Sequence, residues 1–125
     1  MLVMQRFVIL SHDYPHQHWD FMLEEEAVLA TWRLPQPPPD DEGTMRAERI
    51  GDHRPAYLDY EGPIGGNRGQ VVRWDGGLFE VLDEGPGRLV VRLHGARWQG
   101  VVDALQHEGN VWQFQFHHTN HETTK

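Results

Sequence analysis

The chain has 125 residues, the length of one domain, and no cysteine, so disulfides and thiolate metal sites are excluded. Its formal net charge of −8 argues against a protein that coats nucleic acid, but it allows an enzyme that contacts a few phosphates. The 13 glycines, 8 prolines and 5 tryptophans favour a β-rich domain with many turns. No segment reaches transmembrane length and the N-terminal apolar run is too short for a signal peptide, so we expect a cytoplasmic protein without membrane contact.

Apolar and β-branched residues predict three strands in the first third of the chain, at about residues 2–10, 17–23 and 26–34. Pro15 prevents a regular ladder between the first two strands, and Pro35 ends the third. The prolines that follow predict an extended segment, which leads into an acidic loop up to Gly43.

The second of these strands has two different faces, because side chains alternate along a strand. The face expected to pack on a core consists of Trp19, Phe21 and Leu23. The opposite face carries His18, Asp20 and Met22, so an imidazole and a carboxylate stand side by side. A strand commonly presents two ligands to one metal ion in this way.

The rest of the chain alternates between short strands and turns. A polar and aromatic cluster at residues 51–62 has room for one helical turn, and we expect further strands near residues 44–50, 70–74, 78–83, 88–95, 100–106 and 111–117. The predicted turns lie at residues 75–77, 84–87 and 107–110. This spacing predicts an all-β, mainly antiparallel fold that closes into a barrel or a sandwich, with at most short helical turns. We expect one domain over residues 1–117 and a polar tail over residues 118–125.

The candidate metal site consists of His12, His18 and Asp20. Two imidazoles and one carboxylate can hold a divalent ion and leave positions open for water and substrate. Without cysteine, the ligand types favour Mn²⁺, Zn²⁺ or Mg²⁺. The alternative is a solvated polar loop beside a strand, in which the histidines are incidental.

A second cluster supplies the histidine that we pair with this site, His53. Asp52 and Tyr57 are placed to orient its ring, and Arg54 adds a positive charge. The alternative is a surface loop with ordinary charges. Arginines gather around this cluster, which allows a locally positive surface, at Arg46, Arg49, Arg54, Arg68 and Arg73.

The tryptophans are spread at roughly one per strand, so a barrel core explains most of them better than a platform for stacking bases. The sequence contains no P-loop, Rossmann fingerprint, nucleophile elbow or zinc-ribbon pattern.

Several blocks occur in an order that is informative when they are taken together. They are Phe7-Val8-Ile9 ahead of His12, His18-Trp19-Asp20-Phe21, Asp52-His53 with Tyr57, Asp59-Tyr60-Glu61-Gly62, Trp74-Asp75 and Arg92-Leu93-His94-Gly95. This arrangement resembles the 3′-phosphoesterase domain of bacterial DNA ligase D over nearly the whole chain.

The resemblance implies a compact β-barrel enzyme that trims damaged DNA 3′ ends with Mn²⁺ or a similar ion. Such domains remove a terminal 3′ ribonucleotide and then a 3′-phosphate, and their expected partners are nucleic-acid 3′ ends and ligase or polymerase repair proteins. By this resemblance His12, His18 and Asp20 hold the metal. His53 contacts the scissile phosphate with Tyr57 beside it, and these two are the candidate catalytic residues. The candidate substrate-binding residues are Tyr57 and, from its charge next to His53, Arg54.

The chain departs from the family pattern at several positions of the phosphate clamp. The family's arginine two residues after the metal aspartate is Met22 here, and a methionine cannot donate hydrogen bonds to a phosphate. Other clamp positions carry Leu10, Gln36 and Gly51, and the glycine-rich loop near residue 65 is shorter. We therefore consider a stand-alone phosphoesterase, a catalytically silent module that binds metal or nucleic-acid ends, and a β-barrel interaction domain whose histidines bind nothing.

Overall fold

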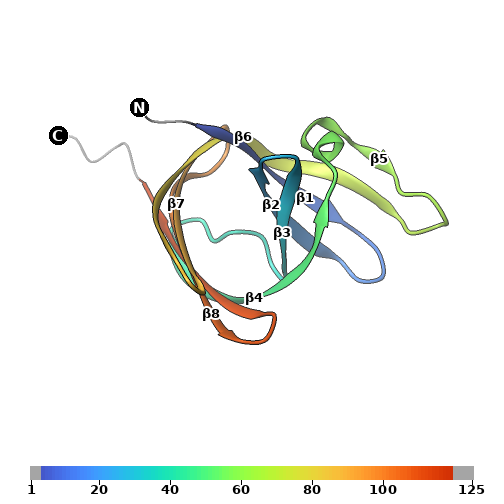
Figure 1. The fold of residues 1–125 in the computed structure, drawn as a ribbon. Helices are drawn as coiled ribbons and strands as arrows, with labels where there is room; N and C mark the ends of the chain where they lie inside the picture. Colours follow the sequence, from blue (N-terminus) through green and yellow to red (C-terminus); the bar gives the residue numbers. More distant parts are fainter. Residues whose placement is uncertain (1–3, 120–125) are drawn as a thin grey trace.

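Residues 4–119, which the computed structural model describes, contain nine strands and one short 3₁₀ helix. They are β1 (Gln5–His12), β2 (His18–Glu25), β3 (Val28–Leu34), β4 (Glu42–His53), η1 (Pro55–Asp59), β5 (Gly62–Pro63), β6 (Gln70–Gly85), β7 (Arg88–Gly95), β8 (Gln99–Glu108) and β9 (Val111–His118). The sheet runs in the order β1-β2-β3-β4-β9-β8-β7-β6, and pairing between β6 and β1 closes it into an antiparallel barrel (Figure 1). Strand β5 pairs with β6 and lies outside the ring.

This architecture confirms the predicted all-β, mainly antiparallel barrel, and η1 is the helical turn expected between residues 51 and 62. Pro55 begins η1, where the missing N–H costs nothing and the fixed φ suits a helical turn. Strand β9 continues to His118, the first residue of the predicted tail, while residues 1–3 and 120–125 lie outside the described part of the chain. Within residues 4–119, no helix combines the length and the apolarity that a membrane span requires.

The predicted turn at Asp75-Gly76-Gly77 is wrong, because β6 continues through these residues. Asp75 is buried, and its carboxylate accepts a hydrogen bond from the backbone N–H of Trp98 at 2.8 Å. A Cβ at Gly77 would lie 2.2 Å from the carbonyl oxygen of His94, so only glycine fits there. The residues that suggested a turn therefore allow β6 to approach β7 and the β7–β8 connection closely.

Both faces of β1 are buried, which explains its uninterrupted apolar run. Phe7 and Ile9 point into the barrel, whereas Val8 and Leu10 point outward beneath η1. The inner set belongs to the barrel core, whose largest members include Phe7, Phe21, Trp32, Leu34, Leu93, Trp98, Phe114 and Phe116. We call the outward set the outer cluster: Val8, Leu10, Met22, Leu29, Leu58 and Val71. Each such side chain contributes about 1.5–3 kcal/mol by burial.

The tryptophans pack in or against the barrel core, as their spread along the chain predicts. Trp32 and Trp98 are buried there, while the other three are partly buried and pack on its edge. The ring of Trp32 meets those of Phe21 and Trp112 edge to face, with centroids 6.2 and 5.6 Å apart.

An ion pair attaches η1 to the outside of the barrel wall. Two guanidinium nitrogens of Arg6, on β1, donate to the carboxylate oxygens of Asp59 at 2.6 and 3.2 Å. This pairing lowers the pKa of Asp59 below its ordinary value of 3.8, first through the hydrogen bonds from Arg6. Because η1 covers the outer cluster, the pair helps to hold that cover in place.

We expect Asp59→Asn to lower the free energy of unfolding modestly near neutral pH, because both groups are solvent-exposed. The depressed pKa means that wild type has this extra stability above pH 3.8 and loses it as the pH falls through the folded-state pKa. Urea unfolding at pH 7 and at about pH 3 measures the difference. A gap between the two proteins that stays constant down to pH 3 would contradict the assignment.

Candidate metal centre

The outer face of the barrel wall brings the predicted ligands together at the end of β1 and the start of β2. The register pairs His12 with His18 and Leu10 with Asp20, so all four side chains project from the same face. His18 and Asp20 are each about 5% exposed at the side chain, and His12 is 15% exposed. The alternation predicted for β2 is therefore confirmed.

The three ligand atoms lie within 4.8 Å of one another. His18 Nε2 is 3.4 Å from Asp20 Oδ1, and His12 Nδ1 is 3.8 Å from Asp20 Oδ2. Both separations are longer than an N–H···O hydrogen bond, which spans about 2.7–3.2 Å. The centroids of the two imidazole rings are 4.9 Å apart.

Backbone carbonyls fix the tautomer of both rings. His12 Nε2 lies 2.9 Å from the carbonyl oxygen of Arg68, and His18 Nδ1 lies 2.9 Å from that of His16. Because a carbonyl only accepts, each of these nitrogens carries the hydrogen. The other nitrogen of each neutral ring therefore turns a lone pair toward Asp20, as metal-binding histidines do when a carbonyl holds their second nitrogen.

At the centre, the acceptor nitrogens of the two neutral imidazole rings therefore face the acceptor oxygens of Asp20. His18 Nε2 and Asp20 Oδ1 are buried and have no hydrogen-bond partner among residues 4–119. Buried polar atoms are normally satisfied, and leaving them unpaired costs about 1–3 kcal/mol each, more for a charged group. A divalent cation among the three atoms would satisfy both, so these residues fit a metal ion with two nitrogen ligands and one oxygen ligand.

A hollow of about 280 Å³ opens beside this centre, and members of both predicted clusters line it. Its lining includes His12, Asp20, Met22, Arg33, His53, Tyr57 and Arg68. A second hollow, of about 470 Å³, lies along His18 and shares Pro15 and Arg33 with the first. The metal ligands therefore stand between two open spaces.

A backbone carbonyl holds the ring of His53 at the edge of the first hollow. Its Nδ1 lies 3.0 Å from the carbonyl oxygen of Gly51 and so carries the hydrogen, which leaves Nε2 without a protein partner. The ring of Tyr57 meets it edge to face, with centroids 5.6 Å apart. The expected role of Asp52 in orienting His53 is wrong, because the Asp52 carboxylate pairs with Arg49 at 3.0 Å.

Comparisons with known proteins find matches over most of this chain. Residues 10–106 match the family model described as the DNA ligase D 3′-phosphoesterase domain. The chain belongs to this family. It is 32% identical over 114 residues to the "Multifunctional non-homologous end joining protein LigD" of Mycobacterium bovis, and 32% identical over 120 residues to the protein of that name in Pseudomonas aeruginosa.

These matches cover 85% and 86% of this chain but only 15% and 14% of the two relatives. The chain therefore spans about one seventh of the length of the relatives that it matches. The resemblance inferred from the sequence blocks is confirmed at the level of this 3′-phosphoesterase domain.

The positions where this phosphoesterase domain departs from the family pattern lie in different surroundings. Leu10 and Met22 are buried in the outer cluster, and both line the first hollow. Gly51 is exposed, and a Cβ there would meet nothing within 4 Å. Gln36 is exposed as well.

Arg54 lies apart from the metal ligands. It lines an adjoining hollow of about 400 Å³, which shares Tyr57, Ile64 and Arg68 with the first hollow. Its role in substrate binding stays a prediction. Asp13 caps the backbone N–H of Gln70 at 2.8 Å and so ties the β1–β2 loop to the start of β6.

Sequence reasoning missed Arg33, which lines the first hollow, and named Arg68 only as one of several arginines of a positive surface, without placing it in this hollow. Arg33 stands directly opposite Asp20 in the β2–β3 register, so pairing those strands residue by residue would have found it. Arg68 belongs to the loop ahead of β6, and only the folded chain brings that loop to His12.

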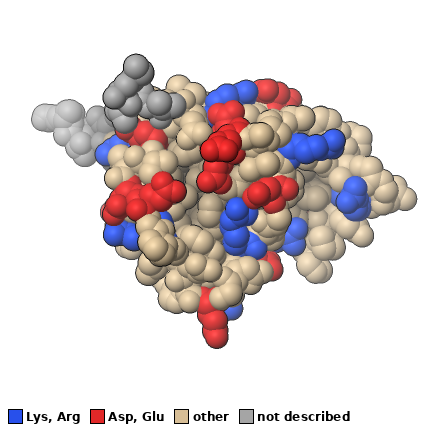
Figure 2. Space-filling model, viewed as in Figure 1, with Lys and Arg blue, Asp and Glu red and all other residues tan. Residues whose placement is uncertain are grey.

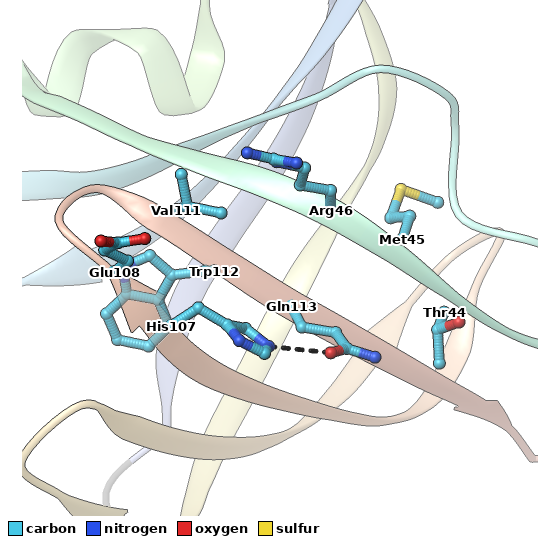
Figure 3. A pocket seen from close by; sticks show the side chains of 8 residues that line it. All are labelled: Thr44, Met45, Arg46, His107, Glu108, Val111, Trp112 and Gln113. Carbon is cyan, nitrogen blue, oxygen red and sulfur yellow. Dashed lines mark hydrogen bonds between the residues drawn. The ribbon is translucent and has the colours of Figure 1, made fainter.

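A larger hollow, of about 510 Å³, lies elsewhere, along β4 and the β8–β9 hairpin (Figure 3). It contains the hydrogen bond from His107 to Gln113, at 2.9 Å, and none of the predicted site residues. Acidic and basic side chains lie interspersed on the face shown in Figure 2, so that face carries no continuous positive field.

We expect Mn²⁺ to raise the free energy of unfolding, by about 2.7 kcal/mol at a free concentration 100 times the Kd. His18→Ala should abolish most of this gain, because it removes a buried ligand. His94→Ala is the matched control, since His94 is an exposed histidine on β7 that pairs with Glu80. Thermal melts and calorimetry with each protein decide the point; equal Mn²⁺ stabilisation of wild type and His18→Ala would contradict the site.

Proposed function

We propose that the chain is a metal-dependent phosphoesterase that removes a 3′-phosphate or a 3′-terminal ribonucleotide from nucleic-acid ends, with Mn²⁺ as the first candidate ion. The observation that carries this proposal is the cluster of His12, His18 and Asp20, in which His18 Nε2 and Asp20 Oδ1 are buried without a hydrogen-bond partner among residues 4–119. Membership of the DNA ligase D 3′-phosphoesterase domain family supports the reaction class. Zn²⁺ and Mg²⁺ are the alternatives.

The chain's own residues divide the work between holding the ion and handling the substrate. A bound divalent ion would polarise phosphoryl oxygens and lower the pKa of a bound water. His12, His18 and Asp20 hold it, and the carbonyls of Arg68 and His16 keep both rings oriented. The tight positioning of these ligands by paired strands favours a defined geometry.

His53 and Tyr57 line the first hollow together with His12 and Asp20, so they would lie beside a phosphoryl group bound there. With Nδ1–H bound to the Gly51 carbonyl, Nε2 of His53 can take a proton from water or, once protonated, donate to a phosphoryl oxygen. The phenol of Tyr57 supplies a second donor within the same space. Together they would stabilise charge that develops on the phosphoryl group.

A second candidate function is a catalytically silent module that binds metal or nucleic-acid ends within a repair assembly. Met22 supports it, because this residue is 1% exposed and presents no hydrogen-bond donor to the hollow beside Asp20. If this candidate is correct, wild type binds 3′ ends without processing them, and Met22→Arg increases turnover. The unfolding free energy of that variant has to be measured alongside, because the substitution places a charge in the outer cluster.

The test of the proposed activity uses a DNA primer that ends in a 3′-phosphate or a single ribonucleotide, incubated with Mn²⁺. We expect wild type to process both ends and His53→Ala to lower kcat by about 10²–10³-fold, since it removes a proton-transfer group.

The metal affinity of His53→Ala should stay unchanged, because His53 is not one of the three ligands. His107→Ala, in the distant hollow, is the control. No processing by wild type, or an unchanged rate in His53→Ala, would overturn the assignment of roles.

A further inference from the structure

We propose that Arg33 is the phosphate-binding cation of the centre and that it favours a terminal phosphomonoester over a phosphodiester. This inference rests on the proposed function, because it names the residue and the substrate class of the same site. Arg33 belongs to β3, and no sequence pattern singled it out.

Strand register aims Arg33 at the metal ligands. It pairs directly with Asp20 on β2, and side chains of opposed residues project from the same face of a sheet. Its side chain lines the first hollow, with His53 and Tyr57, and also the second hollow, with His18. Arg33 therefore borders both open spaces beside the centre.

The guanidinium of Arg33 has no partner within residues 4–119. Its Nε is buried and makes no hydrogen bond, and no carboxylate there forms an ion pair with it. Glu48 stands opposite Arg33 on β4, but its carboxylate accepts a hydrogen bond from Asn110 at 3.2 Å. A partly buried cation without an anion is costly, and a bound anion would remove that cost.

The other groups around the first hollow are less suited to this task. Met22 is apolar, and Arg68 uses its Nε to donate to the carbonyl of Gly65 at 2.7 Å. Arg54 lines the adjoining hollow instead. Arg33 is thus the arginine beside Asp20 whose guanidinium makes no hydrogen bond or ion pair within residues 4–119.

Charge balance points to the substrate class. A divalent ion held by two neutral imidazoles and one carboxylate keeps one net positive charge. A phosphodiester, with one negative charge, already balances it, whereas a phosphomonoester carries about 1.5–2 negative charges at neutral pH. The guanidinium of Arg33 supplies the charge that the monoester needs, and its planar fork suits bidentate contact with phosphate.

The experiment measures binding of two DNA oligonucleotides, one ending in a 3′-phosphate and the other in a 3′-hydroxyl, to the full chain with Mn²⁺. The His53→Ala background keeps the ends from being consumed. We expect tighter binding of the 3′-phosphate, and Arg33→Ala should weaken that binding by about 10- to 100-fold while changing the 3′-hydroxyl little.

Arg33→Lys keeps the positive charge but loses the planar guanidinium that can make bidentate hydrogen bonds, so its effect should be smaller than that of Arg33→Ala. Arg92→Ala is the matched control, because Arg92 lies on β7 and lines neither hollow. Thermal melts show whether each variant folds. If Arg33→Ala does not fold, Arg33→Lys still tests the proposal.

Rates with the otherwise wild-type protein separate this inference from the proposed function. We expect Arg33→Ala to slow 3′-phosphate removal at least tenfold more than removal of a terminal ribonucleotide. If wild type is active and neither Arg33→Ala nor Arg33→Lys changes its rates, the inference is wrong and the proposed function stands. If wild type is inactive but Arg33→Ala still weakens its binding of the 3′-phosphate, the proposed function is wrong and the inference is supported. Equal affinity of both oligonucleotides for the Arg33-containing protein overturns the inference.

Discussion

A buried carboxylate that faces two imidazole lone pairs is the constraint on which the rest of this site depends. Asp20 lies on the outer face of the barrel wall, where η1 and the loop ahead of β6 cover it. Nothing among the described residues donates to its Oδ1. Carbonyl groups hold both histidines in the tautomer that cannot satisfy it. With both rings neutral, a bound cation would supply the missing partner of Asp20 Oδ1.

The barrel stabilises such a site because β1 and β2 are packed on both faces. The inner residues of these strands belong to the barrel core, which fixes their register, and the outer residues then have no freedom to move to another face. A slip by one residue would send His18 and Asp20 into the core and Phe21 to the surface. The core thus positions the candidate ligands His12, His18 and Asp20, although its own side chains lie on the other face of the wall.

The parts of the site that could be predicted from the sequence are those whose residues lie close together along the chain. His12, His18 and Asp20 belong to adjacent strands joined by a short loop, so alternation and spacing were enough to group them. The turn expected at Asp75-Gly76-Gly77 was wrong because these glycines allow close contacts in a continuous strand: a Cβ at Gly76 would meet the Arg73 guanidinium, and one at Gly77 the His94 carbonyl on β7. Asp52 was mistaken for the partner of His53 because the competing Arg49 is visible only in the folded structure.

Distances between neighbours in a sheet explain how the positive charge beside Asp20 can come from a different strand. A residue two positions along the same strand, such as Met22, lies roughly 6.6–6.8 Å away at the Cα. A residue directly opposite on the next strand, such as Arg33, has its Cβ about 4.5–5.5 Å away. An arginine therefore reaches the same space from position 33 at least as well as from position 22. With the charge supplied there, position 22 is free to carry an apolar side chain that completes the outer cluster.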